Sequence, residues 1–192
     1  MVYSYKPMEF TDLWEYNNVN VDRMTETYGM DFYSNYMLKQ HWSEYSVVAR
    51  HGPTGIIAGY MLGKAEGESE DWHGHISAVT IAPAFRRTGL ARRLMEGVER
   101  ISAECHQAYF VDLFVRKSNV AAQRMYQQLG YTTYRTVLGY YSDGPPGATG
   151  AGKRSGEDAL DLRKAMPRNE QRSKSAVIPL KDPIKPHELE WH

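Results

Sequence analysis

The first third of the chain alternates hydrophobic and polar residues in a way that predicts one strand, two helices and a hairpin. Pro7 ends the first alternating run, and the turn at 51–55 contains Gly52, Pro53 and Gly55, residues typical of a hairpin turn. Apolar residues recur at helical spacing in the two segments between these strands. The expected elements are a strand at 2–6, helices at 10–18 and 31–40, and strands at 44–50 and 56–64.

The second part of the pattern predicts strands and helices in alternation. A run over 109–116 is predominantly apolar, which is typical of a strand buried on both faces. Ser118 is a candidate N-cap for a following helix, and Gly130 a candidate residue to end it. The expected elements are a strand at 76–81, a helix from Gly89 to about 106, a strand at 109–116, a helix at 119–129, and strands at 131–141 and 159–166.

Composition divides the chain into one domain and two segments of low apolar content. With 192 residues, the chain suits a single domain, expected over 1–166. Closely spaced glycines and prolines predict a flexible insertion at 143–156. Residues 167–192 are expected to form a poorly ordered tail, in which 177–180 could dock on the domain. Cys105 is the single cysteine, which excludes an internal disulfide, and it is interpreted as a small core residue.

Charge and hydropathy limit the partners of the protein. Lys+Arg and Asp+Glu both number 23, so the formal net charge is zero and no global field attracts nucleic acid or an acidic membrane. We expect no direct DNA partner and no membrane partner. No apolar run reaches the roughly 20 residues of a membrane span, and residues 1–6 lack the layout of a signal peptide. A soluble protein in the cytoplasm is expected.

One stretch, 80–95, carries candidate chemistry. It predicts a strand, a short basic loop and the start of a helix, a junction where free backbone N–H groups and the helix dipole favour an anion. Gly89 would let the backbone approach a ligand. Arginines add positive charge, so the expected guest is a cofactor that bears phosphate; the alternative is an ordinary solvated helix start. The arginines are Arg86, Arg87, Arg92 and Arg93.

The spacing Arg86-x-x-Gly89-x-Ala91 resembles the (Gln/Arg)-x-x-Gly-x-(Gly/Ala) loop of the GCN5-related N-acetyltransferases, whose amides hold the pyrophosphate of acetyl-CoA. Longer sequence segments, here called words, are similar to segments of the catalytic subunits of NatB-type N-terminal acetyltransferases and follow in the same order along the chain. These words are Glu26-Thr27-Tyr28-Gly29, Gly63-Lys64-Ala65-Glu66-Gly67, Trp72-His73-Gly74-His75, Asp112-Leu113-Phe114-Val115-Arg116, Asn119 with Tyr126, Leu129-Gly130-Tyr131, Tyr134-Arg135-Thr136-Val137 and Tyr140-Tyr141.

The resemblance implies a fold and a reaction. The fold would be an α/β (α+β) acetyltransferase domain with a mixed central sheet of about seven strands, splayed between strands 4 and 5 and flanked by about four helices. The reaction would transfer acetyl from acetyl-CoA, with no metal, to the α-amine of proteins that start with Met-Asp, Met-Glu, Met-Asn or Met-Gln. The partners would be a large helical auxiliary subunit, nascent peptide N-termini and, through the auxiliary subunit, the ribosome.

The resemblance also implies a cofactor site. Free backbone groups of the splayed strand would pair with the pantetheine arm and polarise the thioester. Tyr126 would be the catalytic general acid near the sulfur, although its helical spacing with Ala122 and Leu129 also suits a core aromatic residue. The implied cofactor-binding residues are Val79, Thr80, Ile81, Arg86, Arg87, Thr88, Gly89, Leu90, Ala91, Asn119 and Tyr126.

An implied peptide site would select methionine followed by an acid or an amide. His75 is the expected hydrogen-bond donor to the second side chain, with Ser77 on the same strand face. Ser77 departs from the threonine that is usual in the family, and the 143–156 insertion is not part of the shared pattern. The full implied set is Glu26, Tyr28, Gly29, His75, Ser77, Tyr140 and Tyr141.

Other interpretations stay open at this stage. His73 and His75 have the spacing of a metal pair, which we disfavour because no third ligand is evident nearby. The 147–153 stretch fits a nucleotide-binding loop, but Arg154 replaces the Ser or Thr that would meet magnesium. A lysine or small-amine acetyltransferase, or a non-catalytic module that docks on the ribosome or binds RNA, would share the fold.

Apolar and aromatic residues near the N-terminus predict either a surface for a partner protein or a fully internal core. They are Phe10, Trp14, Phe32, Tyr33, Tyr36, Met37 and Trp42.

Overall fold

The computed structural model describes residues 1–21, 24–39, 42–141, 156–169 and 177–189, and these form one seven-stranded mixed sheet. The strand order is β1-β2-β3-β4-β5-β7-β6, in which β4 and β5 are parallel and every other pair is antiparallel. The expected fold is thereby confirmed. The strands are β1 (Tyr3–Pro7), β2 (Val47–His51), β3 (Ile57–Glu66), β4 (His73–Ile81), β5 (Phe110–Arg116), β6 (Thr132–Tyr141) and β7 (Glu157–Ala165).

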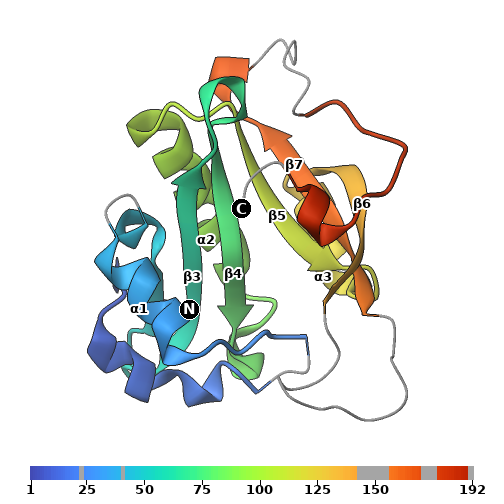
Figure 1. Ribbon diagram of the computed structural model, residues 1–192. Coiled ribbons are helices and arrows are strands. Elements are labelled where there is room, and N and C mark those ends of the chain that lie inside the picture. The colour runs from blue at the N-terminus through green and yellow to red at the C-terminus, as the bar shows by residue number, and fades with distance from the viewer. Residues whose placement is uncertain (22–23, 40–41, 142–155, 170–176, 190–192) are drawn as a thin grey trace.

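Helices cover both faces of the sheet (Figure 1). Helix α1 (Met30–Leu38) lies on one face beside β3, while α2 (Leu90–Arg100) and α3 (Val120–Gln128) lie on the other. Apolar side chains of α2 pack with β4 and β5 in one core cluster, and α1 packs with β3 in a second. The sheet is therefore the middle of three layers, and its strands are buried on two sides.

The strands β4 and β5 separate toward their carboxyl ends (Figure 1). Their pairing runs from His73 opposite Phe110 to Ile76 opposite Leu113 and then stops. At the same point Leu62 of β3 pairs with Ala78 and Gly63 with Ile76, so Ser77 is an extra residue in β4. An extra residue bends a strand, and this bulge turns β4 away from β5.

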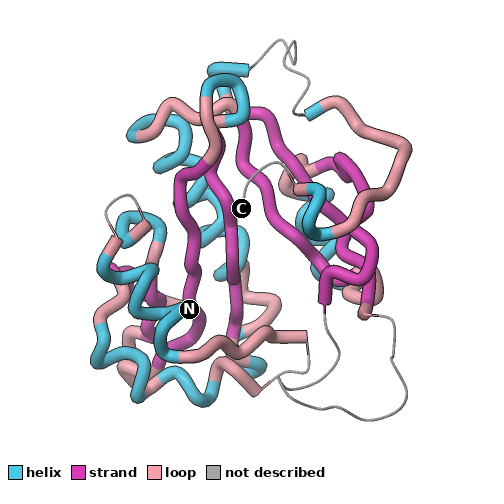
Figure 2. Tube along the Cα trace, viewed as in Figure 1, coloured by secondary structure: helices cyan, strands magenta, loops and turns pink. Residues whose placement is uncertain are grey.

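The prediction of one continuous helix at 10–18 is wrong. The segment forms two short 3-10 helices, Phe10–Trp14 and Tyr16–Asn18. Buried Asp12 accepts a hydrogen bond from the amide of Glu9 and pairs with Lys6 and Arg50, which fixes a tight turn in place of a continuous α-helix. Figure 2 shows these turns gathered with α1 at one side of the sheet. The described residues therefore contain three α-helices, fewer than the four expected.

The helix predicted up to residue 106 changes geometry at Arg100. Residues Ile101–Cys105 form a π-helix, in which each turn holds an additional residue and the buried face rotates. Ser102 is therefore buried, and Cys105, expected in the core, is exposed. Gly74 permits this approach, because a Cβ at that position would lie 2.1 Å from Ser102 Oγ.

Part of the predicted tail is structured. Val177 packs on Phe110, and residues 180–184 run along the outer edge of β6, where the Leu180 amide donates to Tyr134 O over 2.6 Å. The edge strand offers free backbone groups, which explains why a segment poor in regular pattern docks there. The insertion at 143–156 lies outside the described residues except for Gly156, and so does the 147–153 loop.

Among the described residues, none of the helices combines the length and the apolar character that crossing a bilayer requires.

Candidate active site

The separation of β4 and β5 opens a cleft of about 1110 Å³ through the middle of the sheet. Its lining comes from the carboxyl half of β4, the loop before α2, the starts of α2 and α3, the loop before α1, and the end of β6. Most of the expected site residues lie together on this lining. They are Glu26, Tyr28, His75, Ser77, Val79, Thr80, Ile81, Arg86, Arg87, Gly89, Leu90, Ala91, Asn119, Tyr126, Tyr140 and Tyr141.

Two expected residues do not line the cleft. Gly29 is the residue that precedes α1, with φ −71°. The hydroxyl of Thr88 donates to Phe85 O over 2.7 Å and accepts from Tyr3 Oη over 2.9 Å. Thr88 therefore keeps only its backbone amide for a ligand.

The loop before α2 has the backbone geometry of an anion cradle. Arg87 and Gly89 both have positive φ, 64° and 81°, which turns successive amides toward one side. Among the described backbone contacts, none takes up the amides of Arg87, Thr88 or Gly89. The first amides of α2 add to them, together with the positive end of the helix dipole. A phosphate group fits this arrangement.

Arginine side chains at this end of the cleft differ in what they can do. Arg87 and Arg92 are exposed and line the cleft, whereas Arg93 does not line it. Arg86 folds back, since its Nε donates to Ile81 O over 3.2 Å and ties the loop to the end of β4. Arg124 of α3, which the sequence reading missed, lines the cleft from the opposite side.

The edge of β4 that faces the cleft has unused backbone groups. Val79, Thr80 and Ile81 pair with β3 on one side, opposite Met61, Tyr60 and Gly59. On the other side β5 has already diverged, so the backbone there can hydrogen-bond an extended ligand as a further strand would. The resemblance implied this divergence of the two strands.

Tyr126 projects from α3 into the cleft lining while remaining 6% exposed. Burial raises the pKa of its hydroxyl far above its ordinary value of 10.0, so the group stays protonated and can only act as a proton donor near neutral pH. At the start of α3, Asn119 lines the cleft and is the N-cap, accepting from the Ala122 amide over 3.2 Å. The prediction of Ser118 as the N-cap is therefore wrong.

The opposite end of the cleft is lined with tyrosines. Tyr28 stacks on Phe32 at 3.8 Å between ring centroids, and its hydroxyl donates to the carbonyl of Ser77 over 3.3 Å. The hydroxyl of Ser77 bonds Tyr36 of α1. The bulged residue is thereby fixed from two sides by the segment that begins at Tyr28.

Tyr140 and Tyr141 form the wall that comes from β6. Tyr140 stacks on Phe114 at 4.7 Å, and burial, reinforced by the charge of Asp112, raises its pKa to about 12. Tyr141 donates to Phe114 O over 3.1 Å. The hydroxyl of Tyr140 therefore stays protonated and offers a donor to a polar ligand, whereas the hydroxyl hydrogen of Tyr141 is taken by Phe114 O.

Arg116, at the end of β5, joins the two walls of this end. It pairs with Glu26 of the loop before α1 and with Glu157 of β7, the latter over 3.0 Å. Its guanidinium also lies 4.2 Å from the ring centroid of Tyr141. Glu26 is therefore engaged by an arginine of the protein itself. The sequence reading missed this bridge, because its members are up to 131 positions apart.

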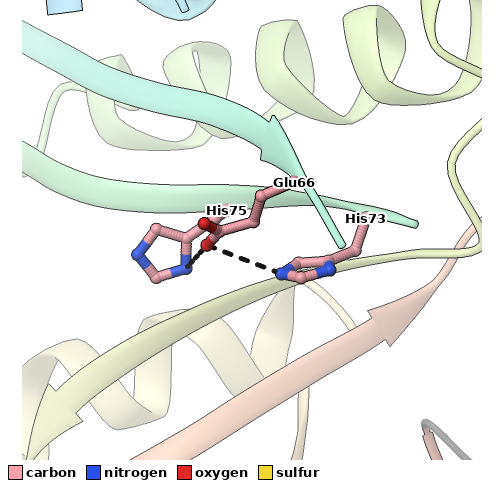
Figure 3. A group of neighbouring side chains, drawn as sticks. All are labelled: Glu66, His73 and His75. Carbon is pink, nitrogen blue, oxygen red and sulfur yellow. Dashed lines mark ion pairs between the residues drawn. The ribbon is translucent and has the colours of Figure 1, made fainter. Parts of the chain in front are cut away.

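His75, which lines the cleft, belongs to a group of largely buried polar side chains, and Figure 3 shows it with Glu66 and His73. His75 Nδ1 lies 2.8 Å from Asp112 Oδ1 of β5 and 3.8 Å from Glu66 Oε1 of β3. His73 lies beside them, 3.8 Å from the same Glu66 oxygen. Asp112 is fully buried, and the sequence did not predict its pairing with His75.

Glu66 corrects the expectation that no third ligand lies near the two histidines, since one ligand atom from each of the three residues lies within 4.8 Å of the others. The geometry nevertheless favours hydrogen bonds. The nitrogen of His75 that faces Glu66 is the one bonded to Asp112, and Nδ1 of His73 is bonded to the carbonyl of Asp71. We assign no metal to this group.

Comparison with known proteins identifies the family. The acetyltransferase (GNAT) family model matches residues 10–131. A Leishmania donovani protein named N-terminal acetyltransferase complex ARD1 subunit homolog is 53% identical over 189 residues, 98% of each chain. The N-terminal acetyltransferase B complex catalytic subunit NAA20 of Arabidopsis thaliana is 48% identical over 180 residues, 94% of each chain.

A solved structure agrees with these relatives. The crystal structure of Chaetomium thermophilum Naa20 in complex with a bisubstrate analogue has a TM-score of 0.83 and 36% identity, covering 96% of this chain and 97% of its own. The N-terminal acetyltransferase A complex catalytic subunit ard1 of Schizosaccharomyces pombe is more distant, 35% identical over 142 residues, 72% of this chain and 78% of its own. The splayed sheet, the amide cradle and these likenesses together place the chain in the GNAT acetyltransferase family, among the catalytic subunits of N-terminal acetyltransferases.

Proposed function

We propose that this protein transfers acetyl from acetyl-CoA to the α-amine of proteins that start with Met-Asp, Met-Glu, Met-Asn or Met-Gln, as the catalytic subunit of a NatB-type complex. The observation that carries the proposal is a single cleft with an amide cradle for phosphate at one end and a tyrosine and histidine wall at the other. Relatives named as NatB catalytic subunits match nearly the whole chain.

The cradle residues would hold the cofactor. Amides from Arg87 to Ala91 face its diphosphate, and Arg87 and Arg92 add charge. Asn119 and the free edge of Val79 to Ile81 take the arm that follows. When bound, acetyl-CoA supplies an activated acetyl thioester.

The chemistry needs positioning more than a strong base. An α-amine has a pKa of about 8, so a useful fraction is neutral near pH 7. Backbone N–H groups of β4 polarise the carbonyl while the amine forms the new C–N bond and loses its proton to solvent. As the C–S bond breaks, Tyr126 donates its phenolic proton to the departing sulfur and regains one from solvent.

The tyrosine and histidine wall would bind the peptide. His75 and Ser77 approach the second side chain, and Tyr140 and Tyr141 close the cleft from β6. Glu26 acts through Arg116, which holds the loop that carries Tyr28. Gly29 supports the same loop at the start of α1.

An exposed apolar surface supports a partner subunit. Of the residues singled out near the N-terminus, Tyr33 and Tyr36 are buried in the core, but Phe10 is 44% and Trp14 77% exposed. Met30 and Leu38 of α1 are exposed nearby, at 50% and 73%. A relative of known structure is the NatB acetyltransferase complex bound to a bisubstrate inhibitor. We propose that a large helical auxiliary subunit covers this surface, and that the complex acts in the cytoplasm on nascent chains at the ribosome.

Mass spectrometry of peptides incubated with acetyl-CoA tests the function. The full chain, alone and with the auxiliary subunit, should acetylate peptides that begin with Met-Asp and leave those that begin with Met-Lys or Ser unmodified. A lysine acetyltransferase would instead modify the side chain of a Met-Lys peptide. Acetylation of none of the peptides, together with salt-sensitive binding of ribosomal RNA, would support a non-catalytic module.

A further inference from the structure

The pair formed by His75 and Asp112 determines where the histidine carries its proton. Asp112 is 0% exposed and lies opposite Arg163 of β7 in the sheet register. Burial alone would raise the pKa of this carboxyl, but His73, His75 and Arg163 outweigh it and lower the pKa to about 2. Asp112 is therefore an anion that accepts a hydrogen bond from His75.

An anion at Nδ1 fixes the tautomer. A carboxylate only accepts hydrogen bonds, so Nδ1 of His75 must carry a hydrogen at the 2.8 Å contact. Figure 3 shows Nε2 on the far side of the ring, turned away from Glu66 and His73. His75 also lines the cleft, and no hydrogen bond to Nε2 is present among the described residues. Nε2 is the atom left to meet a ligand.

We propose that Asp112 holds the proton of His75 on Nδ1, so that Nε2 reads the second residue of the peptide in two ways. In the charged ring Nε2–H donates to the carboxylate of Asp or Glu, and in the neutral ring the Nε2 lone pair accepts from the side-chain amide of Asn or Gln. This inference rests on the proposed function. Asp112 is a positioning residue, because it acts through His75.

The two modes explain how one site takes acids and amides. A donor alone would favour acids, and an acceptor alone would reject them. With Nδ1 blocked by Asp112, a single protonation at Nε2 switches between the two. No rotation of the ring is needed, because the bond to Asp112 keeps Nδ1 in place in both states.

The switch falls in an accessible pH range. Burial lowers the pKa of His75, and Lys64 lowers it too, but the charge and hydrogen bond of Asp112 and the charge of Glu66 raise it overall above 6.5. Other titratable groups around the ring are His73 on the same strand and Tyr140, whose pKa of about 12 keeps it neutral. The charged mode therefore dominates below pH 6.5 and is lost as pH rises through the higher folded-state value.

The test is the ratio of kcat/KM for a Met-Asp peptide to that for a Met-Asn peptide, measured from pH 5.5 to 9 with the full chain in complex with its auxiliary subunit. Ionisation of the α-amine and of Tyr126 affects both peptides equally and cancels in the ratio. We expect the ratio to fall roughly tenfold across the titration of His75. A hydrogen bond between charged groups is stronger than a neutral one, and the difference corresponds to a change of about tenfold in binding. A ratio that does not change with pH would overturn the proposal.

Two variants separate the pair from general effects. Asp112→Asn removes the anion, so the fall of the ratio should move to lower pH. Glu44→Gln is the matched control, because Glu44 also bonds a histidine, His106, at 2.8 Å but lies outside the cleft lining. It should leave the ratio and its midpoint unchanged.

A measurement without turnover covers the case in which Asp112→Asn does not fold or the complex is inactive. Ring ¹⁵N resonances, with His75→Gln to assign the signal, should show the Nδ1–H tautomer at high pH and a midpoint above 6.5. An Nε2–H tautomer would overturn the inference even if the enzyme acetylates both peptides. Absence of acetylation with the Nδ1–H tautomer present would instead contradict the proposed function.

Discussion

Tyr126 illustrates how one side chain can satisfy both a structural and a chemical interpretation. Its helical spacing with Ala122 and Leu129 suits a core residue, and the side chain is in fact buried among the residues of the main core cluster. It also lines the cleft. Burial raises the pKa of its hydroxyl further above the ordinary value of 10.0, so the packing is compatible with a protonated side chain that acts as a proton donor.

Replacing Tyr126 with Phe should therefore lower kcat without loosening the fold. Phe keeps the ring and removes only the hydroxyl, so we expect kcat to fall about 100-fold or more, the range for loss of a general acid, with little change in the melting temperature. Steady-state kinetics with a Met-Asp peptide measure this.

Tyr131→Phe is the matched control, because Tyr131 is a buried tyrosine 6.0 Å from Tyr126 between ring centroids and does not line the cleft. It should retain kcat. An unchanged kcat in Tyr126→Phe would remove this residue from the mechanism.

Side-chain roles could be read from the sequence only where a recognisable word carried them. His75 and Tyr126 lie in such words. Asp112 lies in such a word too, but no role was assigned to it, because the pattern of its strand indicates burial and its partners come from β4 and β7. Arg116 was visible as part of a word, but its bridge to Glu26 and Glu157 exists only after the chain folds.

The turn into α2 is the element on which cofactor binding depends. Gly89 has φ 81°, and a Cβ added there would meet nothing within 4 Å, so Gly89→Ala strains the backbone without a clash. We expect a loss of stability of about 1 kcal/mol and at least tenfold weaker binding of CoA in calorimetry, because the amides after Arg87 lose their alignment.

Gly97→Ala makes the same chemical change in the middle of α2, where a Cβ also meets nothing within 4 Å. It should stabilise the helix by up to about 1 kcal/mol and leave CoA affinity unchanged. Equal CoA affinity in the two variants would show that the turn is not a ligand site.

The Arg116 bridge joins the loop before α1 to the β6 and β7 hairpin across the cleft. Arg116→Met should raise KM for the peptide roughly tenfold and leave KM for acetyl-CoA unchanged, because charge-assisted contacts are worth about 1.5–3 kcal/mol and lie at the peptide end.

Arg50→Met provides the comparison, since Arg50 pairs with two carboxylates, Asp12 at 2.6 Å and Glu15 at 2.7 Å, outside the cleft lining. It should lower stability and not the peptide KM. A similar rise in both variants would mean that Arg116 acts on the fold as a whole.

Elements were predictable where the hydrophobic period was long. All seven strands and the helices α1, α2 and α3 follow the pattern to within a few residues. The bulge at Ser77 did not, because a single extra residue leaves the apolar content of β4 unchanged. The divergence of β4 and β5 was therefore available only from the resemblance to a family.

At the scale of the whole molecule, the docked tail makes residues 177–189 part of the fold. Three backbone hydrogen bonds join it to β6, and Val177 is buried on Phe110. A chain that ends at residue 176 should lose about 3–5 kcal/mol of unfolding free energy, at about 1 kcal/mol for each bond and 1.5 for the valine. Thermal or urea unfolding measures this.

A chain that ends at residue 189 keeps all of these contacts and should unfold like the full protein. The shorter chain should also aggregate more readily, since it exposes the edge of β6. Equal stability of the two truncations would show that the segment contributes nothing. The apolar residues at 177–180 suggested that this segment could dock, but the sequence did not predict where, because the segment pairs with β6 through its backbone and has little side-chain pattern.

The extra residue in β4 has a consequence for how the cleft could be lost or gained. Deleting Ser77 would let Ala78, opposite Leu62, follow directly on Ile76, opposite Gly63, and nothing would then turn the strand aside. The parallel strands β4 and β5 could then pair along their full length, and a continuous sheet would replace the open cleft. A crystal structure of this deletion variant would show a protein that is still folded and has lost the cleft between β4 and β5. In this architecture, one inserted residue in a strand separates a transferase from an inactive protein of the same fold.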